Sequence, residues 1–193
     1  QDVRAQYKEH EEILSKISHD EYYAITGDPL GFTLSAARMI WLKNNEPENW
    51  KRAAKVVDMQ EYFLKEFGAE GYYTDLSTAS RNSMCDVNNH CWSRKMVEDV
   101  FELRMDQKAE LTTDCGRIVG HINEEISKLT GLPVGCNICV GAHDQNCSTF
   151  GGGAIHDGDA VMVIGTFGSC FVVSDTPIRD PKKKLIVKGN HGV

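Results

Sequence analysis

The sequence is short of proline and of basic residues, and it contains no long apolar run. Its 193 residues include 5 prolines, and 21 lysines and arginines stand against 28 aspartates and glutamates, which gives a net charge of −7. An acidic chain disfavours binding to nucleic acid or to anionic lipid, because both present negatively charged phosphates. No segment approaches the roughly 20 apolar residues that a membrane-spanning helix needs. We therefore expect neither nucleic acid nor a membrane as a partner.

The amino-terminal residues also lack an initiator methionine and the charged-then-apolar pattern of a secretory signal. The seven cysteines are an odd number and form no cysteine-dense module, and several have apolar neighbours, as in Ile138-Cys139-Val140. This pattern is typical of reduced, buried thiols. We expect a cytoplasmic protein, and we expect this chain to be a piece of a larger one.

Apolar residues make up 41% of the chain and charged residues 25%, which is enough for a packed core. Apolar periodicity predicts helices over 4–18, 35–44, 50–57, 59–67, 92–103, 124–130 and 144–150. Strands are expected over 117–120, 136–140, 160–166 and 169–173, and 72–80 is expected to be extended. We interpret the triple glycine at 151–153 as a domain boundary.

The segment CNICVGAHDQNC, residues 136–147, raises the question of a metal site. Its spacing is C-x2-C-x3-H-x3-C, which has the ligand order of a zinc knuckle but shorter later gaps. Four zinc ligands must converge tetrahedrally, whereas a strand through Cys139 would turn that thiol away from its neighbours. A redox pair at Cys136 and Cys139 would need a helix N-terminus to activate one thiol, and here the pair lies within an apolar strand. We favour structural thiols and no metal, with a zinc-binding module left open as an alternative.

Asp144 is the strongest candidate for chemistry in this segment. A strand, a short turn and a helix that begins at Asp144 would place its carboxylate at the carboxyl end of the strand, where α/β proteins bind ligands. Free backbone N–H groups would stabilise the charge, and the carboxylate can accept a proton from a substrate hydroxyl. The alternative is that Asp144 only caps the helix.

A glycine-containing turn, Gly165-Thr166-Phe167-Gly168-Ser169, joins two apolar strands near the end of the chain. Backbone N–H groups and two hydroxyls in such a turn can hold phosphate oxygens. An ordinary hairpin turn has the same composition, so this alternative stays open.

The order of several motifs resembles the FGGY carbohydrate kinases, the sugar and polyol kinases that include xylulokinase, gluconate kinase and glycerol kinase. The similarity extends over nearly the whole chain. The motifs that carry it are TLSAARMIWLKNN (33–45), EPENW (46–50), TDLSTASR (74–81), Cys85-Asp86, Trp92-Ser93, GHI (120–122), TGLPVG (130–135) and GAHDQ (141–145).

The resemblance implies roles for individual residues. Asp144 corresponds to the catalytic aspartate of the family, and Gln145 to its substrate-contacting neighbour. Thr33 stands where some members have a substrate-contacting tyrosine. Gly165 and Thr166 correspond to the turn that meets the nucleotide phosphates.

The resemblance also implies an α/β fold of the actin-like, ribonuclease-H-like type, with a mixed sheet and flanking helices. Residues 1–153 would be the carboxyl-terminal part of the substrate domain, and 154–193 the first hairpin of a similar nucleotide domain. The implied activity is ATP-dependent phosphorylation of a sugar or polyol hydroxyl, with ATP and Mg²⁺ as cofactors. The first phosphate loop of the family, Asp-x-Gly-x-Thr, and its adenosine-binding glycine segment are not in this sequence.

Because these parts are missing, we expect the chain alone to be inactive. The competing interpretation is a non-catalytic binding module, either a half-kinase interaction domain or the zinc-binding domain considered above. We also expect the chain to form a homodimer, because a divided domain exposes apolar surface.

Overall fold

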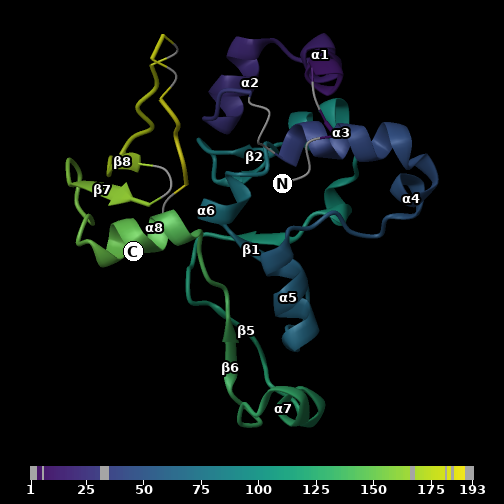
Figure 1. Ribbon diagram of the computed structural model, residues 1–193, viewed down its shortest axis with the longest axis vertical. Helices are drawn as coiled ribbons and strands as arrows, with labels where there is room; N and C mark the ends of the chain where they lie inside the picture. The colour runs from purple at the N-terminus through teal and green to yellow at the C-terminus, as the bar shows by residue number, and fades with distance from the viewer. Residues whose placement is uncertain are drawn as a thin grey trace.

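The computed structural model describes residues 4–5, 7–30, 35–165, 168–180, 182–183 and 185–189. The predicted site residues Thr33 and Thr166 lie outside these residues. Figure 1 shows a helical body built around α1 to α4 (residues 7–52) and an arm of β5, α7 and β6 (residues 118–139) that projects from it. A hairpin of β7 and β8 (residues 160–172) lies beside α8 (Asp144–Gly151). No helix among the described residues is long and apolar enough to cross a membrane.

Two helices have the ends that the sequence predicts. α5 (Met59–Phe67) begins after Asp58, whose backbone N–H donates to the Glu61 carboxylate at 2.7 Å, and it ends at Gly68 in the left-handed conformation. α7 (Glu124–Thr130) begins after Asn123, whose side chain accepts from the Ile126 N–H, and it ends at the left-handed Gly131. The capping residues therefore set the ends of both helices.

The remaining helices are α1 (Tyr7–Lys16), α2 (His19–Thr26), α3 (Ser35–Asn45), α4 (Pro47–Arg52), α6 (Leu76–Ala79) and α8 (Asp144–Gly151), with the π-helix η1 (Lys95–Val100) and the 3₁₀ turn η2 (Met105–Gln107).

Three predicted elements differ from the structure. The helix expected over 50–57 is α4, which starts earlier because Pro47 favours the first helical turn. The helix expected over 92–103 is restricted to η1, after the short strand β3 (Cys91–Trp92). The stretch 72–80 is extended only as far as Asp75, which caps α6 and so converts the following residues into a helical turn.

The strands form four two-stranded sheets among the described residues. Their members are β1 (Tyr73–Asp75) parallel to β4 (Glu110–Thr112), β2 (Cys85–Asp86) with β3 (Cys91–Trp92), β5 (Ile118–His121) with β6 (Asn137–Cys139), and β7 (Ala160–Ile164) with β8 (Gly168–Val172), the last three pairs antiparallel. The predicted α/β class is confirmed, but the mixed sheet is divided into these pairs in the described part of the chain.

The main core joins α1, α2, α3 and η1, with Ile13, Tyr22, Ile40 and Phe101 fully buried. The Ile13, Ile40 and Phe101 side chains each contribute about 1.5–3 kcal/mol through apolar burial. A second cluster lies where the arm meets α5, and a third lies beneath α6. The parts of the molecule that carry the candidate site therefore rest on separate small cores.

Candidate functional site

Asp144 is the first residue of α8, as the sequence predicts. The strand β6 ends at Cys139, and the chain then passes through the buried Val140, whose N–H donates to the Arg117 carbonyl at 3.0 Å. His143 caps the helix in an extended conformation. The strand, turn and helix start thus place Asp144 at the carboxyl end of β6 with an exposed side chain.

A buried hydrogen-bonded chain holds the residue before Asp144. The backbone N–H of His143 donates to Ser77 Oγ at 2.9 Å, and Ser77 Oγ donates in turn to the Asp75 carboxylate. Asp75 also accepts from the Ser77 N–H at 2.7 Å and from Gln60 Nε2 at 3.4 Å. Both Asp75 and Ser77 are buried, so this chain positions the turn in front of α8.

The Asp144 carboxylate itself is 89% exposed, and Oδ1 accepts from the Gln145 N–H at 2.7 Å. His143 Nδ1 lies 3.2 Å from the same oxygen and accepts from the same N–H at 3.3 Å. Burial, and next the nearby Arg81, lower the pKa of His143, so the imidazole is neutral and the contact is not an ion pair. Asp144 Oδ2 has no hydrogen-bond partner among the described residues and is available to a ligand.

The other predicted site residues are placed as follows. Gln145 is half-buried in the first turn of α8, next to Asp144. Gly165 is exposed and directly follows β7 in the hairpin. A side chain at Gly165 would meet no atom within 4 Å, so the described surroundings do not require glycine there.

The expectation of buried thiols is wrong for most of the seven cysteines. Cys85 is buried and Cys115 is half-buried, whereas the rest are exposed: Cys91, Cys136, Cys139, Cys147 and Cys170. In β6 the residues alternate, so Ile138 packs inward while its neighbours face solvent. The described residues contain no group of three or more His, Cys, Asp or Glu side chains placed to hold a metal ion. The zinc alternative therefore has no support in this part of the chain.

Sequence reasoning missed four residues near Asp144. Asp75 and Ser77 were assigned to an extended stretch, although an aspartate followed by small polar residues is a helix-start signal. Arg81 and Lys188 lie close enough to His143 to lower its pKa. No sequence signal brings Lys188 to this place, because its position depends on the path of the carboxyl-terminal segment.

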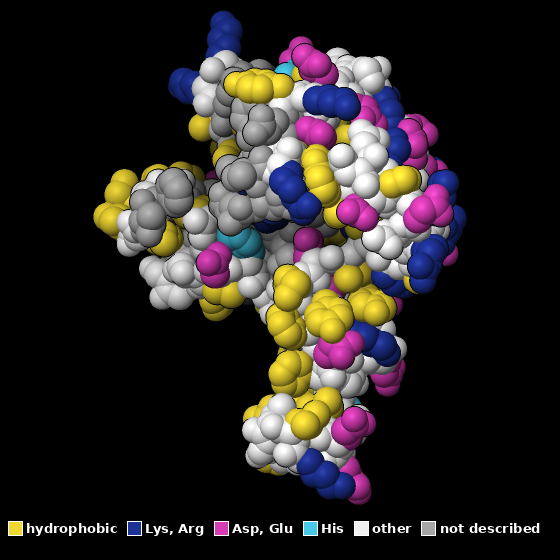
Figure 2. All heavy atoms as spheres, turned by 45° about the vertical axis from the view of Figure 1, so that its right-hand side comes forward, with side chains coloured by type: hydrophobic (Ala, Val, Ile, Leu, Met, Phe, Trp, Pro, Cys, Tyr) yellow, Lys and Arg dark blue, Asp and Glu magenta, His cyan; other side chains and the backbone are white. Residues whose placement is uncertain are grey.

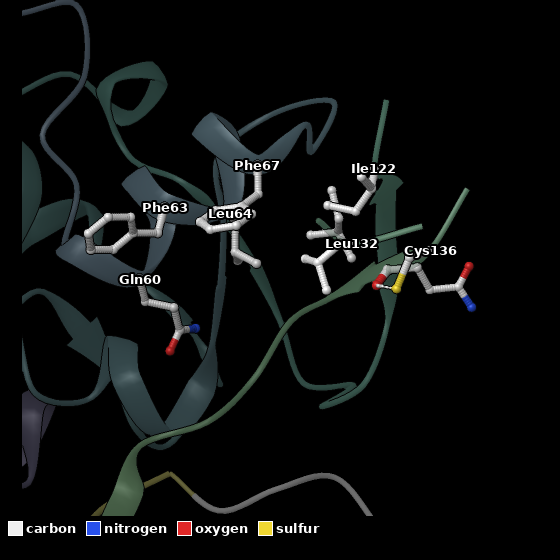
Figure 3. A pocket seen from close by; sticks show the side chains of 9 residues that line it. Gln60, Phe63, Leu64, Phe67, Ile122, Leu132 and Cys136 are labelled. Carbon is white, nitrogen blue, oxygen red and sulfur yellow. Dashed lines mark hydrogen bonds between the residues drawn. The ribbon is translucent and has the colours of Figure 1, made fainter. Parts of the chain in front are cut away.

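An apolar hollow of about 320 Å³ lies between α5 and the arm. Figure 3 shows Phe63, Leu64 and Phe67 on one side, facing Ile122 and Leu132 on the other. Figure 2 shows hydrophobic side chains gathered along this face of the molecule. No charged side chain lines the hollow, so its chemistry does not match a polyhydroxylated ligand.

The comparisons with known proteins agree on one family. The sequence profile of the "FGGY family of carbohydrate kinases, N-terminal domain" matches residues 1–151. Gluconokinase of Bacillus licheniformis is 26% identical over 173 residues, which is 90% of this chain and 33% of that protein.

Solved structures show the same fold. The xylulose kinase from Rhodospirillum rubrum superposes with a TM-score of 0.80 at 23% identity, over 90% of this chain and 35% of that one. The glycerol kinase of Plasmodium falciparum, solved with ADP, superposes with a TM-score of 0.74 at 20% identity, over 86% and 34% of the two chains.

The chain spans about a third of the length of the curated relatives that it matches. The matched profile covers more than half of the chain, and the predicted actin-like fold is confirmed by the structural neighbours. The chain belongs to the FGGY family of carbohydrate kinases.

Proposed function

We propose that this chain supplies the acceptor side of a kinase that transfers the γ-phosphoryl group of ATP to a hydroxyl of a sugar, polyol or sugar acid. The observation that carries the proposal is the exposed Asp144 carboxylate at the start of α8, held in place by the Ser77–His143 hydrogen bond. Family membership supports the reaction class, and the similar proteins are named for gluconate, xylulose and glycerol.

Asp144 acts as the general base in this proposal. Its Oδ2 accepts the proton of the substrate hydroxyl as the oxygen attacks the γ-phosphorus, while Oδ1 keeps its hydrogen bond from the Gln145 N–H. Burial lowers the pKa of His143, so the imidazole is neutral at neutral pH, and its Nδ1 accepts from the same Gln145 N–H. The Gln145 side chain, in the same helical turn, contacts the substrate. Thr33 is a second proposed substrate contact from the segment before α3.

The nucleotide side of the proposal uses the β7–β8 hairpin. The turn after Gly165, with Thr166, holds phosphate oxygens through backbone N–H groups and a hydroxyl. Mg²⁺ supplies charge neutralisation at the phosphates when bound.

The proposed domain division follows from these roles. Residues 1–153 form part of the substrate domain, and 154–193 begin the nucleotide domain. Closure of one domain on the other then assembles the site, since phosphoryl transfer depends mostly on positioning and charge stabilisation.

The test uses an intact kinase that contains this chain and compares the Asp144→Asn and Asp99→Asn variants. Asp99 is exposed and lies in η1, away from the site, so it controls for loss of one negative charge. We expect Asp144→Asn to reduce kcat on the order of 10²–10⁴-fold, the range of a general base, while sugar binding is largely retained. A kcat within tenfold of the parent would refute the assignment.

The isolated 193-residue chain is expected to show no sugar-dependent ATP hydrolysis or transfer, because it spans about a third of its relatives. A coupled ADP-release assay with pentoses, hexoses, polyols and aldonates checks this expectation. Turnover by the chain alone would show that the remaining parts of the relatives are dispensable.

We also propose that the chain forms a homodimer through the apolar face of α5 and the arm, where Met59, Phe63 and Phe67 are exposed. Light scattering behind size exclusion measures this, and a monomer across micromolar concentrations contradicts it. A cytoplasmic location stays a prediction of the sequence.

A further inference from the structure

The carboxyl-terminal segment 185–189 returns to the amino-terminal part of the chain. In Figure 1 the yellow end of the chain turns at the top of the view and runs down beside α2. The Tyr23 hydroxyl donates to the Leu185 carbonyl, and the Val187 N–H donates to the Gly27 carbonyl at 2.7 Å. The segment, which we call the strap, therefore lies along the end of α2.

The strap approaches the body so closely that two glycines are needed. Gly27 ends α2 with φ +68°, and a Cβ there would lie 2.6 Å from the Val187 carbonyl oxygen. Gly189 is buried against α6, and a Cβ there would lie 2.3 Å from Leu76 Cγ. Glycine permits such a close approach of two backbone segments, so the strap packs at one defined position on the body.

A buried ion pair joins the strap to the body. Lys188 Nζ binds the Asp28 carboxylate, and the two side chains are only 11% and 5% exposed. Burial is the main cause that lowers the pKa of Lys188, to about 8, and Asp28 opposes it. Removing one partner of such a pair leaves the other charge buried and unpaired, which is strongly unfavourable, whereas removing both is often neutral.

The strap also contacts the helix that begins with Asp144. Asn146 Nδ2 donates to the Gly189 carbonyl at 3.1 Å. At the other end of the helix, Gly152 packs against Val161 of β7, where an added Cβ would lie 3.1 Å from a Val161 methyl carbon. Residues beyond the triple glycine therefore hold α8 at both ends.

We propose that the strap is a positioning element for α8 and that the Asp28–Lys188 pair is its anchor. Through the Asn146–Gly189 hydrogen bond, the strap holds the first turn of α8, which contains Asp144. Lys188 and Asp28 act through α8 and contact no reacting atom, so they are positioning residues. The consequence for phosphoryl transfer rests on the proposed function, while the docking itself does not.

Amide hydrogen exchange, measured by NMR on the whole 193-residue chain, tests the docking without any need for activity. Three amides report on three places: Val187 on the strap, Cys147 (which donates to the His143 carbonyl) on the first turn of α8, and Val140 on the arm. In Lys188→Met we expect exchange at Val187 and Cys147 to rise at least about tenfold, with Val140 unchanged.

The matched variants separate the charge pair from general damage. Lys182→Met makes the same substitution at an exposed lysine six positions earlier and should leave all three amides unchanged. The double variant Asp28→Asn with Lys188→Met removes both charges and should bring Val187 and Cys147 most of the way back to the parent rates.

The close packing of Gly189 against Leu76 offers a second test that does not change the ion pair. Gly189→Ala should release the strap with the same pattern of exchange, because Leu76 leaves no room for the methyl group. Gly71→Ala is its control, since a Cβ there meets nothing closer than 3.4 Å.

The proposal fails in three ways that these data distinguish. Unchanged exchange at Val187 in Lys188→Met would show that the pair is not the anchor. Faster exchange at Val187 with unchanged Cys147 would show that the strap does not hold α8. Equal acceleration at all three amides would show a global loss of stability and no selective role. None of these outcomes bears on Asp144 as the base, which only the kcat of Asp144→Asn decides.

Discussion

Ser77 Oγ lies 2.9 Å from the backbone nitrogen of His143, although the two residues are 66 positions apart in the chain. The contact joins the capped turn α6 to the residue that caps α8. The Asp144 side chain is 89% exposed, but this contact holds the backbone of the residue in front of it. The backbone position of Asp144 therefore depends on the buried side chains of Asp75 and Ser77.

Replacing Ser77 by alanine should destabilise the chain by about 1–3 kcal/mol, because the His143 N–H loses its acceptor and Asp75 loses a donor. Urea denaturation measures the change. Ser15→Ala is the control, since the exposed Ser15 hydroxyl donates to the Glu12 carbonyl within its own helix, α1. An equal, small effect for both variants would mean that the Ser77 contact does not hold the turn.

Asp144→Asn should change the stability of the chain by less than about 1 kcal/mol, the range of a charge at a helix N-terminus. The side chain is exposed, and Asn can still accept from the Gln145 N–H. Thermal denaturation beside the parent checks this value. A loss of several kcal/mol would assign Asp144 a structural role and would complicate any kinetic result.

Glu61 should make stability depend on pH. The residue is fully buried, and burial, then the Asp58 carboxylate, raise the pKa of Glu61 from 4.5 to about 7. Between these values the folded state keeps a proton that the unfolded state has lost, so this group's contribution to stability falls as pH rises from about 4.5 to 7. The full change is on the order of 3 kcal/mol. Lys108 lies nearby and opposes the shift.

The Glu61→Gln variant tests this sign. Glutamine keeps an acceptor for the Asp58 N–H but does not titrate, so the variant should lose less stability than the parent between pH 5 and pH 7.5. Denaturation curves at the two pH values give the comparison, with the exposed Glu48→Gln as the control. Parallel pH profiles for parent and Glu61→Gln would disprove the assignment.

The thiols should react in the order of their exposure. A thiol reagent in the native chain should modify the exposed cysteines first, among them Cys136, Cys139 and Cys147. Cys85 should react only after unfolding, because burial raises its pKa to about 12 and the thiolate is the reactive form. Mass spectrometry after timed labelling identifies each site. Early modification of Cys85 would contradict its burial beneath α6.

Local sequence was sufficient for α5 and α7, whose ends are set by capping residues. The ends of α5 and α7 follow from Asp58, Gly68, Asn123 and Gly131, and each of these caps acts within a few residues of its helix. The helix start at Asp144 was predictable for the same reason. The ordered motifs were likewise readable, because the family pattern is a property of the sequence itself.

Burial and long-range partners were decided only by tertiary packing. The exposed cysteines of β6 and of the hairpin looked buried in sequence, since apolar neighbours do not reveal which face of a strand is covered. The Ser77–His143 bond and the Asp28–Lys188 pair join residues far apart in the chain. Hydrogen bonds and ion pairs of this kind depend on where the chain passes in space. The motifs therefore predict Asp144 as a candidate catalytic residue, while only the fold shows the groups that hold it.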